Sequence, residues 1–232
     1  MAVARRALRK GFGENWDKLG RNRDEYPERS SRCPPNCVTS MAAASSEPTR
    51  RPDFRDLIVG SAVGLAAWVA GYLLTYILVA PGLRETALSR LLEALQGEPA
   101  TVDMVGWVFY NAHLVLTVVS DVPVLGSSSA SFIGGDGGFT PLLYVVPIGL
   151  LIAAGLAAGR YRGASAVDDG VLAGLTVVPG YAVGAVVGAQ LFAVSAVGAT
   201  VSPDPVTAIA LAGVGYPAIC GAMGGALSGA TA

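Results

Sequence analysis

The sequence predicts an all-α integral membrane protein, a helical bundle with about five membrane-embedded helices and a short interfacial amphipathic helix. Four stretches contain no charged residue and are each at least 23 residues long: 57–83, 137–159, 170–203 and 205–232. A helix rises about 1.5 Å per residue, so roughly 20 apolar residues cross a hydrocarbon core of about 30 Å. The composition, with 52% hydrophobic and 14% charged residues, fits one small membrane domain with a polar tail. The lipid bilayer is therefore the predicted partner, and a multi-pass protein of the cell membrane is the expectation.

The first 40 residues differ from the rest of the chain. They hold nine Lys and Arg against five acids, whereas residues 41–232 hold seven Arg, no Lys and twelve acids. Pro, Gly, Ser and Arg mix there without periodicity, which predicts a disordered basic segment. Met41 opens a plausible natural start, so we hypothesise that residues 1–40 are an over-extended gene start; a basic tail at lipid headgroups is the alternative. Residues 41–56 read as a polar lead-in, and 57–229 as the helical membrane domain.

The membrane domain divides into segments at its prolines, glycines and charges. We expect spans over about 57–80, 141–159, 171–197 and 206–227, an amphipathic interfacial helix over 84–96, a shorter helix over 102–119, and a flexible loop over 121–140.

The shorter helix carries a polar stripe. Its members recur at spacings of three and four, which places them on one helical face: Asp103, Gly106, Tyr110, His113, Thr117 and Ser120. His113 is the single histidine of the chain. An ionisable group at membrane depth is costly and usually faces protein or a water-filled cavity. The stripe is thus a candidate pathway, and the alternative is a neutral His113 that is hydrogen-bonded to a neighbouring helix.

Glycines recur at four-residue spacing in the later spans, in the pattern called a glycine zipper. The two double repeats are Gly180, Gly184 and Gly188, and Gly221, Gly225 and Gly229. Small residues four apart let two helix backbones approach closely in lipid. They predict tight helix packing, within the bundle, in a homo-oligomer or against partner membrane helices.

Prolines interrupt three of the expected spans, at Pro147, Pro179 and Pro217. Each removes a backbone hydrogen bond and can kink a helix. Broken helices at corresponding positions mark binding sites in many transporters, so these prolines are hinge candidates. Prolines are also common in ordinary membrane helices.

No enzyme, cofactor or metal site is predicted. Cys33 and Cys37 form one close pair without a nearby histidine, and Cys220 lies in an apolar run, whereas structural zinc needs four ligands. The glycine cluster over 134–138 lacks the Gly-Lys-Ser/Thr ending of a phosphate loop. No Gly-x-Ser-x-Gly pattern occurs, and no feature indicates binding to nucleic acid.

The arginines bear on topology, because they are enriched in cytoplasmic loops. From Met41 onward, a cytoplasmic N-terminus gives five arginines inside and two outside if 102–119 does not cross the membrane. It gives three inside and four outside if that segment crosses. Charge therefore favours four full spans and one partial one, while an eighteen-residue length permits a crossing.

Several strings carry a resemblance to a known family. They are GYLLTY at 71–76, GWVFYNAH at 106–113, YVVP at 144–147 and YP at 216–217. Over about 56–229 the chain resembles a family of small, uncharacterised membrane proteins of halophilic archaea that are often labelled transporters. The resemblance implies a membrane bundle in a haloarchaeal cell membrane and supplies no catalytic residues.

We expect a small transporter or channel component, because kinked, glycine-rich spans surround one polar-faced helix. The alternative is a non-catalytic membrane scaffold, or a subunit of a larger membrane assembly. A water-accessible cavity lined by Tyr110 and His113 would favour transport, and a dry core would favour the scaffold.

Overall fold

The fold is that of a computed structural model, which describes residues 52–84, 90–91, 93–94, 100–122, 126–134, 138–196 and 199–232. The hypotheses on residues 1–40 and most of 41–56 lie outside the described residues. So does most of the expected interfacial helix, of which 90–91 and 93–94 are helical and exposed.

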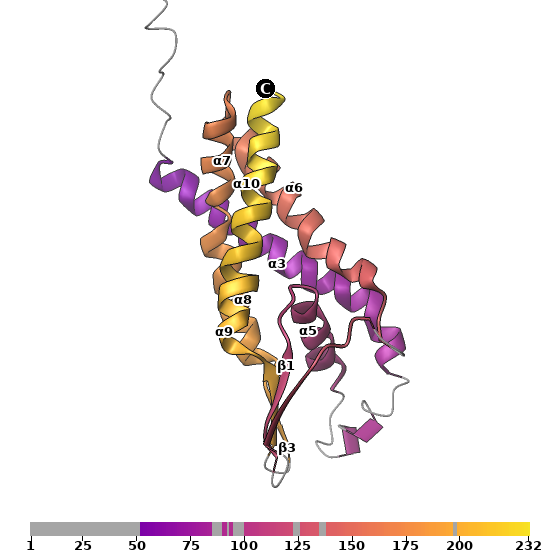
Figure 1. The fold of residues 1–232 in the computed structure, drawn as a ribbon. Helices are drawn as coiled ribbons and strands as arrows, with labels where there is room; N and C mark the ends of the chain where they lie inside the picture. The colour runs from indigo at the N-terminus through magenta and orange to yellow at the C-terminus, as the bar shows by residue number, and fades with distance from the viewer. Residues whose placement is uncertain are drawn as a thin grey trace, which may run out of the picture. The chain divides into compact units, whose positions relative to one another are not determined.

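The described chain is mostly helical, and four of its helices are long and apolar enough to cross a membrane. They cover 54–83, 141–162, 167–191 and 205–230. The helical elements, most of which are labelled in Figure 1, are α3 (Phe54–Leu83), η1 (Pro141–Tyr144), α6 (Val145–Arg162), α7 (Val167–Leu175), α8 (Val178–Leu191), α9 (Pro205–Thr207), η2 (Ala208–Gly215) and α10 (Tyr216–Ala230).

Each of the last three spans changes its winding just before a proline. A 3₁₀ turn, η1, precedes α6 with Pro147; residues 176–177 separate α7 from α8 with Pro179; and the π-helix η2 precedes α10 with Pro217. Pro179 and Pro217 stand in the first turn of their helices, where a missing N–H breaks no helical hydrogen bond. These prolines therefore start regular helix after an irregular turn.

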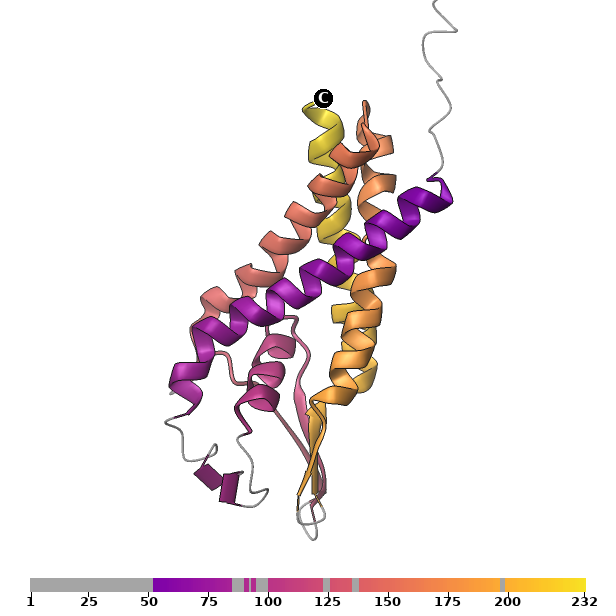
Figure 2. The ribbon, with the colours of Figure 1, turned by 180° about the vertical axis from the view of Figure 1, so that it is seen from behind.

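The helices pack in two groups that share α6. α10 packs against α6 and α7, while α3 packs against α6 and α8 and also contacts a short helix, α5 (Thr101–Asn111). A large apolar cluster surrounds α5, and a second one joins Leu151, Val177, Tyr181 and Cys220 in the α6–α8–α10 region. Figure 2 shows α3 crossing the other long helices obliquely.

A four-stranded antiparallel sheet extends from the helices, so the expectation of an all-α protein holds only in part: the chain is mostly helical, with a small sheet beside the helices. Its strands are β1 (Thr117–Val122), β2 (Gly126–Ala130), β3 (Val194–Ala196) and β4 (Ala199–Pro203). Their order is β2-β1-β4-β3, with Thr117 opposite Ala130 in β2 and Pro203 in β4. β1 and β4 are rich in Val and Thr, whose branched side chains suit a pleated surface. The loop expected over 121–140 thus contains β2 and a bridge between Ile133 and Phe139.

The helix expected over 102–119 is much shorter in the structure. α5 has 11 residues, or about 16 Å at the rise of an α-helix, which is too short to cross a membrane. It is followed by a turn in which Leu114 is left-handed, with φ of 61°. The N–H groups of Leu114 and Val115 donate to the carbonyls of Asn111 and Tyr110, which is the pattern of a Schellman motif. The chain then leaves this turn as β1.

The start of α3 and the C-terminus lie toward the same end of the described bundle, and the sheet lies at the opposite end (Figures 1 and 2).

Candidate functional site

His113 is the polar centre of the described core. It follows α5 directly, and its side chain is 0% exposed. Its Nδ1 lies 2.8 Å from the carbonyl oxygen of Phe109, and its Nε2 lies 2.7 Å from the hydroxyl of Tyr181 in α8. A carbonyl can only accept, so Nδ1 carries the proton and Nε2 accepts from the tyrosine hydroxyl. Both ring nitrogens of a neutral His113 are therefore satisfied by protein.

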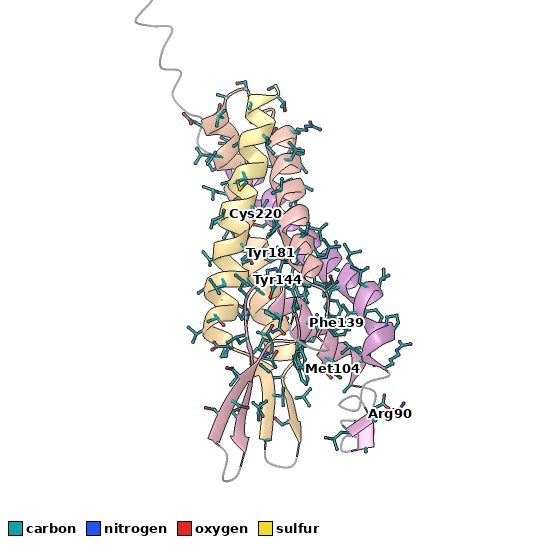
Figure 3. The ribbon with its side chains drawn as sticks, turned by 45° about the vertical axis from the view of Figure 1, so that its right-hand side comes forward. Arg90, Met104, Phe139, Tyr144, Tyr181 and Cys220 are labelled. Atoms are coloured by element: carbon teal, nitrogen blue, oxygen red, sulfur yellow. The ribbon has the colours of Figure 1, made fainter. Side chains whose placement is uncertain are left out.

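Aromatic rings close around this histidine. Its centroid lies 4.8 Å from that of Phe109, 5.2 Å from that of Tyr216 and 5.8 Å from that of Tyr181. The rings come from α5, α8 and α10, and so the turn after α5 is held against two of the long spans. Figure 3 shows Cys220, Tyr181 and Tyr144 following one another along the bundle toward the sheet.

Tyr110 is equally buried and is anchored to the same span. Its hydroxyl donates to the carbonyl of Ala185, in the middle of α8. One turn earlier, Trp107 Nε1 donates to the carbonyl of Phe192, just after α8, at 2.7 Å. α5 is thus fixed along the end of α8 by two side-chain hydrogen bonds.

The polar stripe does not form one helical face. Asp103 is half-buried in the first turn of α5, and burial raises the pKa of its carboxyl. Thr117 and Ser120 belong to β1, where Thr117 accepts from the Asn111 side chain at 3.3 Å and Ser120 donates to the carbonyl of Thr200 at 3.4 Å. The structure brings Tyr110 and His113 into one buried cluster and separates the other members from it.

Asn111 is a central residue that the sequence reasoning missed. Its Nδ2 donates to the carbonyl of Val115 at 2.7 Å, and its Oδ1 accepts from the backbone N–H of Phe132 at 2.7 Å. A single side chain therefore holds the end of α5, the turn and the segment after β2 together. The available signal was one amide inside an otherwise apolar string, which becomes informative once the helix is known to end there.

The glycines of α10 lie against α7. A Cβ on Gly225 would lie 2.0 Å from the carbonyl oxygen of Gly170, and a Cβ on Gly170 would lie 2.1 Å from that of Gly225. A Cβ on Gly229 would lie 2.1 Å from the carbonyl oxygen of Ala166, and one on Gly221 would lie 2.8 Å from that of Gly174. The backbones of α7 and α10 are thus in contact along this stripe.

The glycines of α8 face α3. A Cβ on Gly180 would lie 1.7 Å from the carbonyl oxygen of Ser61, while one on Gly184 or Gly188 would overlap the ring of Trp68 at 2.7 and 2.3 Å. These three glycines therefore have two roles, because one permits backbone contact and two accommodate an indole.

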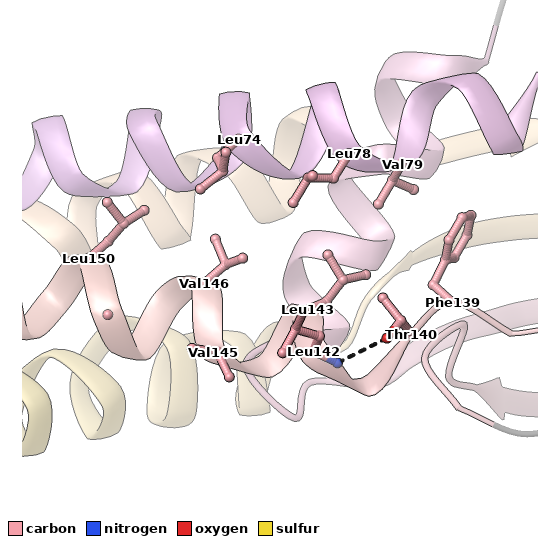
Figure 4. Close-up of a pocket in the computed structure, with 11 residues that line it drawn as sticks. Leu74, Leu78, Val79, Phe139, Thr140, Leu142, Leu143, Val145, Val146 and Leu150 are labelled. Atoms are coloured by element: carbon pink, nitrogen blue, oxygen red, sulfur yellow. Dashed lines mark hydrogen bonds between the residues drawn. The ribbon is translucent and has the colours of Figure 1, made fainter.

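The described cavities do not include the buried cluster. One is an apolar groove of about 550 Å³ between α3 and α6, lined among others by Leu74, Leu78, Val146 and Leu150 (Figure 4). Another, of about 310 Å³, lies at the far ends of the same two helices. Tyr110 and His113 line neither, and both side chains are fully buried.

The described residues offer no group of three or more His, Cys, Asp or Glu that could hold a metal ion. Cys220, the cysteine among them, is buried as a free thiol. In chemical terms, the cluster around His113 has the hydrogen-bonding and packing of a structural core.

Comparison with known proteins identifies the family of the chain and adds no function. Residues 39–232 match the family of unknown function DUF7978, and the chain belongs to it. The comparison with curated proteins gave no match. The comparison with solved structures gave none either.

Proposed function

We propose that the protein is a non-catalytic membrane scaffold, a subunit of a larger membrane assembly that displays its sheet to a protein partner. The observation that carries the proposal is the complete burial of His113 and Tyr110, whose side-chain polar atoms are hydrogen-bonded to protein and which line neither of the two cavities described above. A transport pathway through polar membrane residues normally requires a water-filled cavity beside them.

The sheet supports the scaffold role through β2, one of its two edge strands. Its five residues read Gly-Ser-Ser-Ser-Ala, and residues 127–130 are exposed. β2 pairs with β1 on one side and ends the strand order on the other. Sheet edges in soluble surroundings are commonly protected by charge or proline, and β2 has neither. Such an edge can accept an added strand from a partner, whose backbone would continue the ladder.

Neighbouring proline substitutions test this proposal with their own control. The N–H groups of adjacent strand residues point to opposite edges, and Ser128 and Ser129 lie in the regular part of the ladder. Of Ser128→Pro and Ser129→Pro, one therefore removes an outward N–H and the other removes an N–H that faces β1. When the protein is extracted from native membranes and run on a native gel, we expect the full chain to migrate as an assembly larger than the 23.5 kDa monomer. The outward substitution should release the monomer while its thermal unfolding stays unchanged. A wild-type chain that is monomeric in those membranes would contradict the proposal.

A transporter or channel component is the second candidate function. It is favoured by the break between α7 and α8 and by the eight-residue π-helix η2, since π-helical turns often lie at functional sites. Pro179 and Pro217 would then act as hinges. Reconstituted protein should carry a tracer-ion flux that His113→Ala abolishes, and the absence of any flux would contradict this candidate.

We further propose a haloarchaeal cell membrane as the location. The seven basic residues after Met41 are all arginine, and acids outnumber them by five. A homo-oligomer and partner membrane helices both remain proposals for what the assembly contains. Identification of the proteins that crosslink to β2 in source cells distinguishes them.

A further inference from the structure

A polar cavity lies where the membrane-spanning parts of α3 and α6 end. It measures about 310 Å³ and is lined by Arg55 and Asp56 from the first turn of α3 and by Tyr161 and Arg162 from the last turn of α6. The charge-free run of α3 begins at Leu57, directly after this pair. The cavity is therefore at the level where hydrocarbon gives way to lipid headgroups and water.

The described residues that line the cavity carry two positive charges and one negative charge. Two guanidinium groups face one carboxylate, and that carboxylate is already used by the fold. Asp56 Oδ2 lies 3.4 Å from Arg162 Nε and accepts from the backbone N–H of Asp53 at 3.2 Å. Arg55, which is exposed, adds the surplus positive charge.

The position of the two arginines suits an anion from the membrane surface. The side chain of Arg162 is 6% exposed and is held by its ion pair, so its guanidinium is fixed in place. Arg55 supplies a second, solvent-facing guanidinium, and planar guanidinium forks match phosphate oxygens. Tyr161 is 52% exposed at the same helix end, as amphipathic aromatic rings often are at membrane interfaces.

We propose that this cavity binds the phosphate group of an anionic membrane lipid. The proposal is independent of the scaffold function, because a scaffold or a transporter could carry such a site. The same chemistry could be met by inorganic phosphate, and separate arms of one experiment distinguish the two sources.

The experiment measures lipid retention on the purified full chain by native mass spectrometry. Phosphatidylglycerol and phosphatidylcholine are added in equal amount, and we expect preferential retention of phosphatidylglycerol. Arg55→Gln should weaken that retention by about tenfold, the usual effect of losing a hydrogen bond to a charged group. Because Arg55 is exposed, the Arg55→Gln protein should unfold at the same temperature as the wild type, so the variant remains testable.

Arg160 provides the matched control. It stands in the same last turn of α6, is exposed and does not line the cavity. Arg160→Gln removes the same charge and should leave retention unchanged. If Arg160→Gln and Arg55→Gln weaken retention equally, the attraction is diffuse and the proposed site is overturned.

The source arms use thermal unfolding in neutral detergent. Stabilisation by phosphatidylglycerol that inorganic phosphate does not reproduce assigns the site to a lipid. Equal stabilisation by inorganic phosphate alone overturns the lipid assignment, and no effect of either overturns the phosphate site.

Discussion

Leu114, the left-handed residue after α5, destabilises the fold relative to a glycine at the same position. Leu114 has φ of 61° and a side chain that is 58% exposed, so it gains little from packing while it holds the Schellman turn. A left-handed conformation costs an L-residue about 1–2 kcal/mol, part of which glycine returns as unfolded-state entropy. We expect Leu114→Gly to raise the free energy of unfolding by about 0.5–1 kcal/mol in a denaturant titration in detergent.

The control for this prediction is Leu116→Gly. Leu116 is 45% exposed and lies two residues further on, where the structure requires no positive φ. Its substitution should destabilise the protein. If both glycines changed stability in the same direction, the strain assigned to Leu114 would be wrong.

The hydrogen bonds of His113 make Tyr181 a stabilising residue. Nδ1 must donate to the Phe109 carbonyl, so the ring cannot switch tautomer when its Nε2 partner is removed. Tyr181→Phe should therefore lower the free energy of unfolding by about 1–3 kcal/mol, the usual cost of one unsatisfied buried polar group.

Tyr161→Phe is the matched substitution, because Tyr161 is 52% exposed and its hydroxyl can hydrogen-bond to water. It should change the stability by less than about 0.5 kcal/mol. Equal effects of the two tyrosines, measured by thermal unfolding in the same detergent, would contradict the hydrogen-bonded assignment of His113.

At the scale of the elements, the contact between α7 and α10 depends on the absence of side chains. A methyl group on Gly225 would overlap the carbonyl of Gly170, which is backbone and cannot move aside without shifting the helix. Gly225→Ala should destabilise the protein by about 1–3 kcal/mol, as overpacking does in cores.

Gly149 in α6 is the control glycine, since a Cβ there would meet nothing within 4 Å. Gly149→Ala should raise the stability by about 0.5–1 kcal/mol through helix propensity alone. Opposite signs for the two alanines in one unfolding series are the expected result, and matching signs would contradict the close approach of the two backbones.

The long helices were predictable because lipid imposes a length and an absence of charge that a single sequence displays. Their ends were not: α3 continues through Pro81 to Leu83, and the span expected to reach Val197 ends at Leu191. Beyond those ends the solvent changes, and short apolar strings no longer distinguish helix from strand.

Neither the sheet nor the candidate site could be predicted from the sequence, and the reason is the same for both. Val115, Leu116 and Val119 fit the apolar face of a helix as well as they fit a strand. The decisive feature is the turn at Leu114, where the left-handed residue is not a glycine. Once the chain turns there, Thr117 and Ser120 leave the stripe that spacing had given them. The pairing of His113 with Tyr181 joins residues 68 positions apart, which no local pattern encodes.

For the whole molecule, the short α5 decides the topology. With four crossings, the start of α3 and the end of α10 lie on one side, together with Arg55, Arg160 and Arg162, and the sequence has Arg50 and Arg51 just before α3. Arg84 and Arg90 lie on the other side with the sheet. The excess of arginine predicts that the C-terminus is cytoplasmic and that β2 faces outward.

Single cysteines in a cysteine-free background measure this directly. The three native cysteines are replaced by alanine or serine, and Ser128→Cys in β2 is compared with Ala230→Cys at the end of α10. A membrane-impermeant maleimide should label Ser128→Cys in intact cells, and Ala230→Cys only after the membrane is opened. Labelling of both from outside would mean an even number of crossings between them, whereas α6, the α7–α8 span and the span that ends in α10 give three, so that result would contradict the four-span topology.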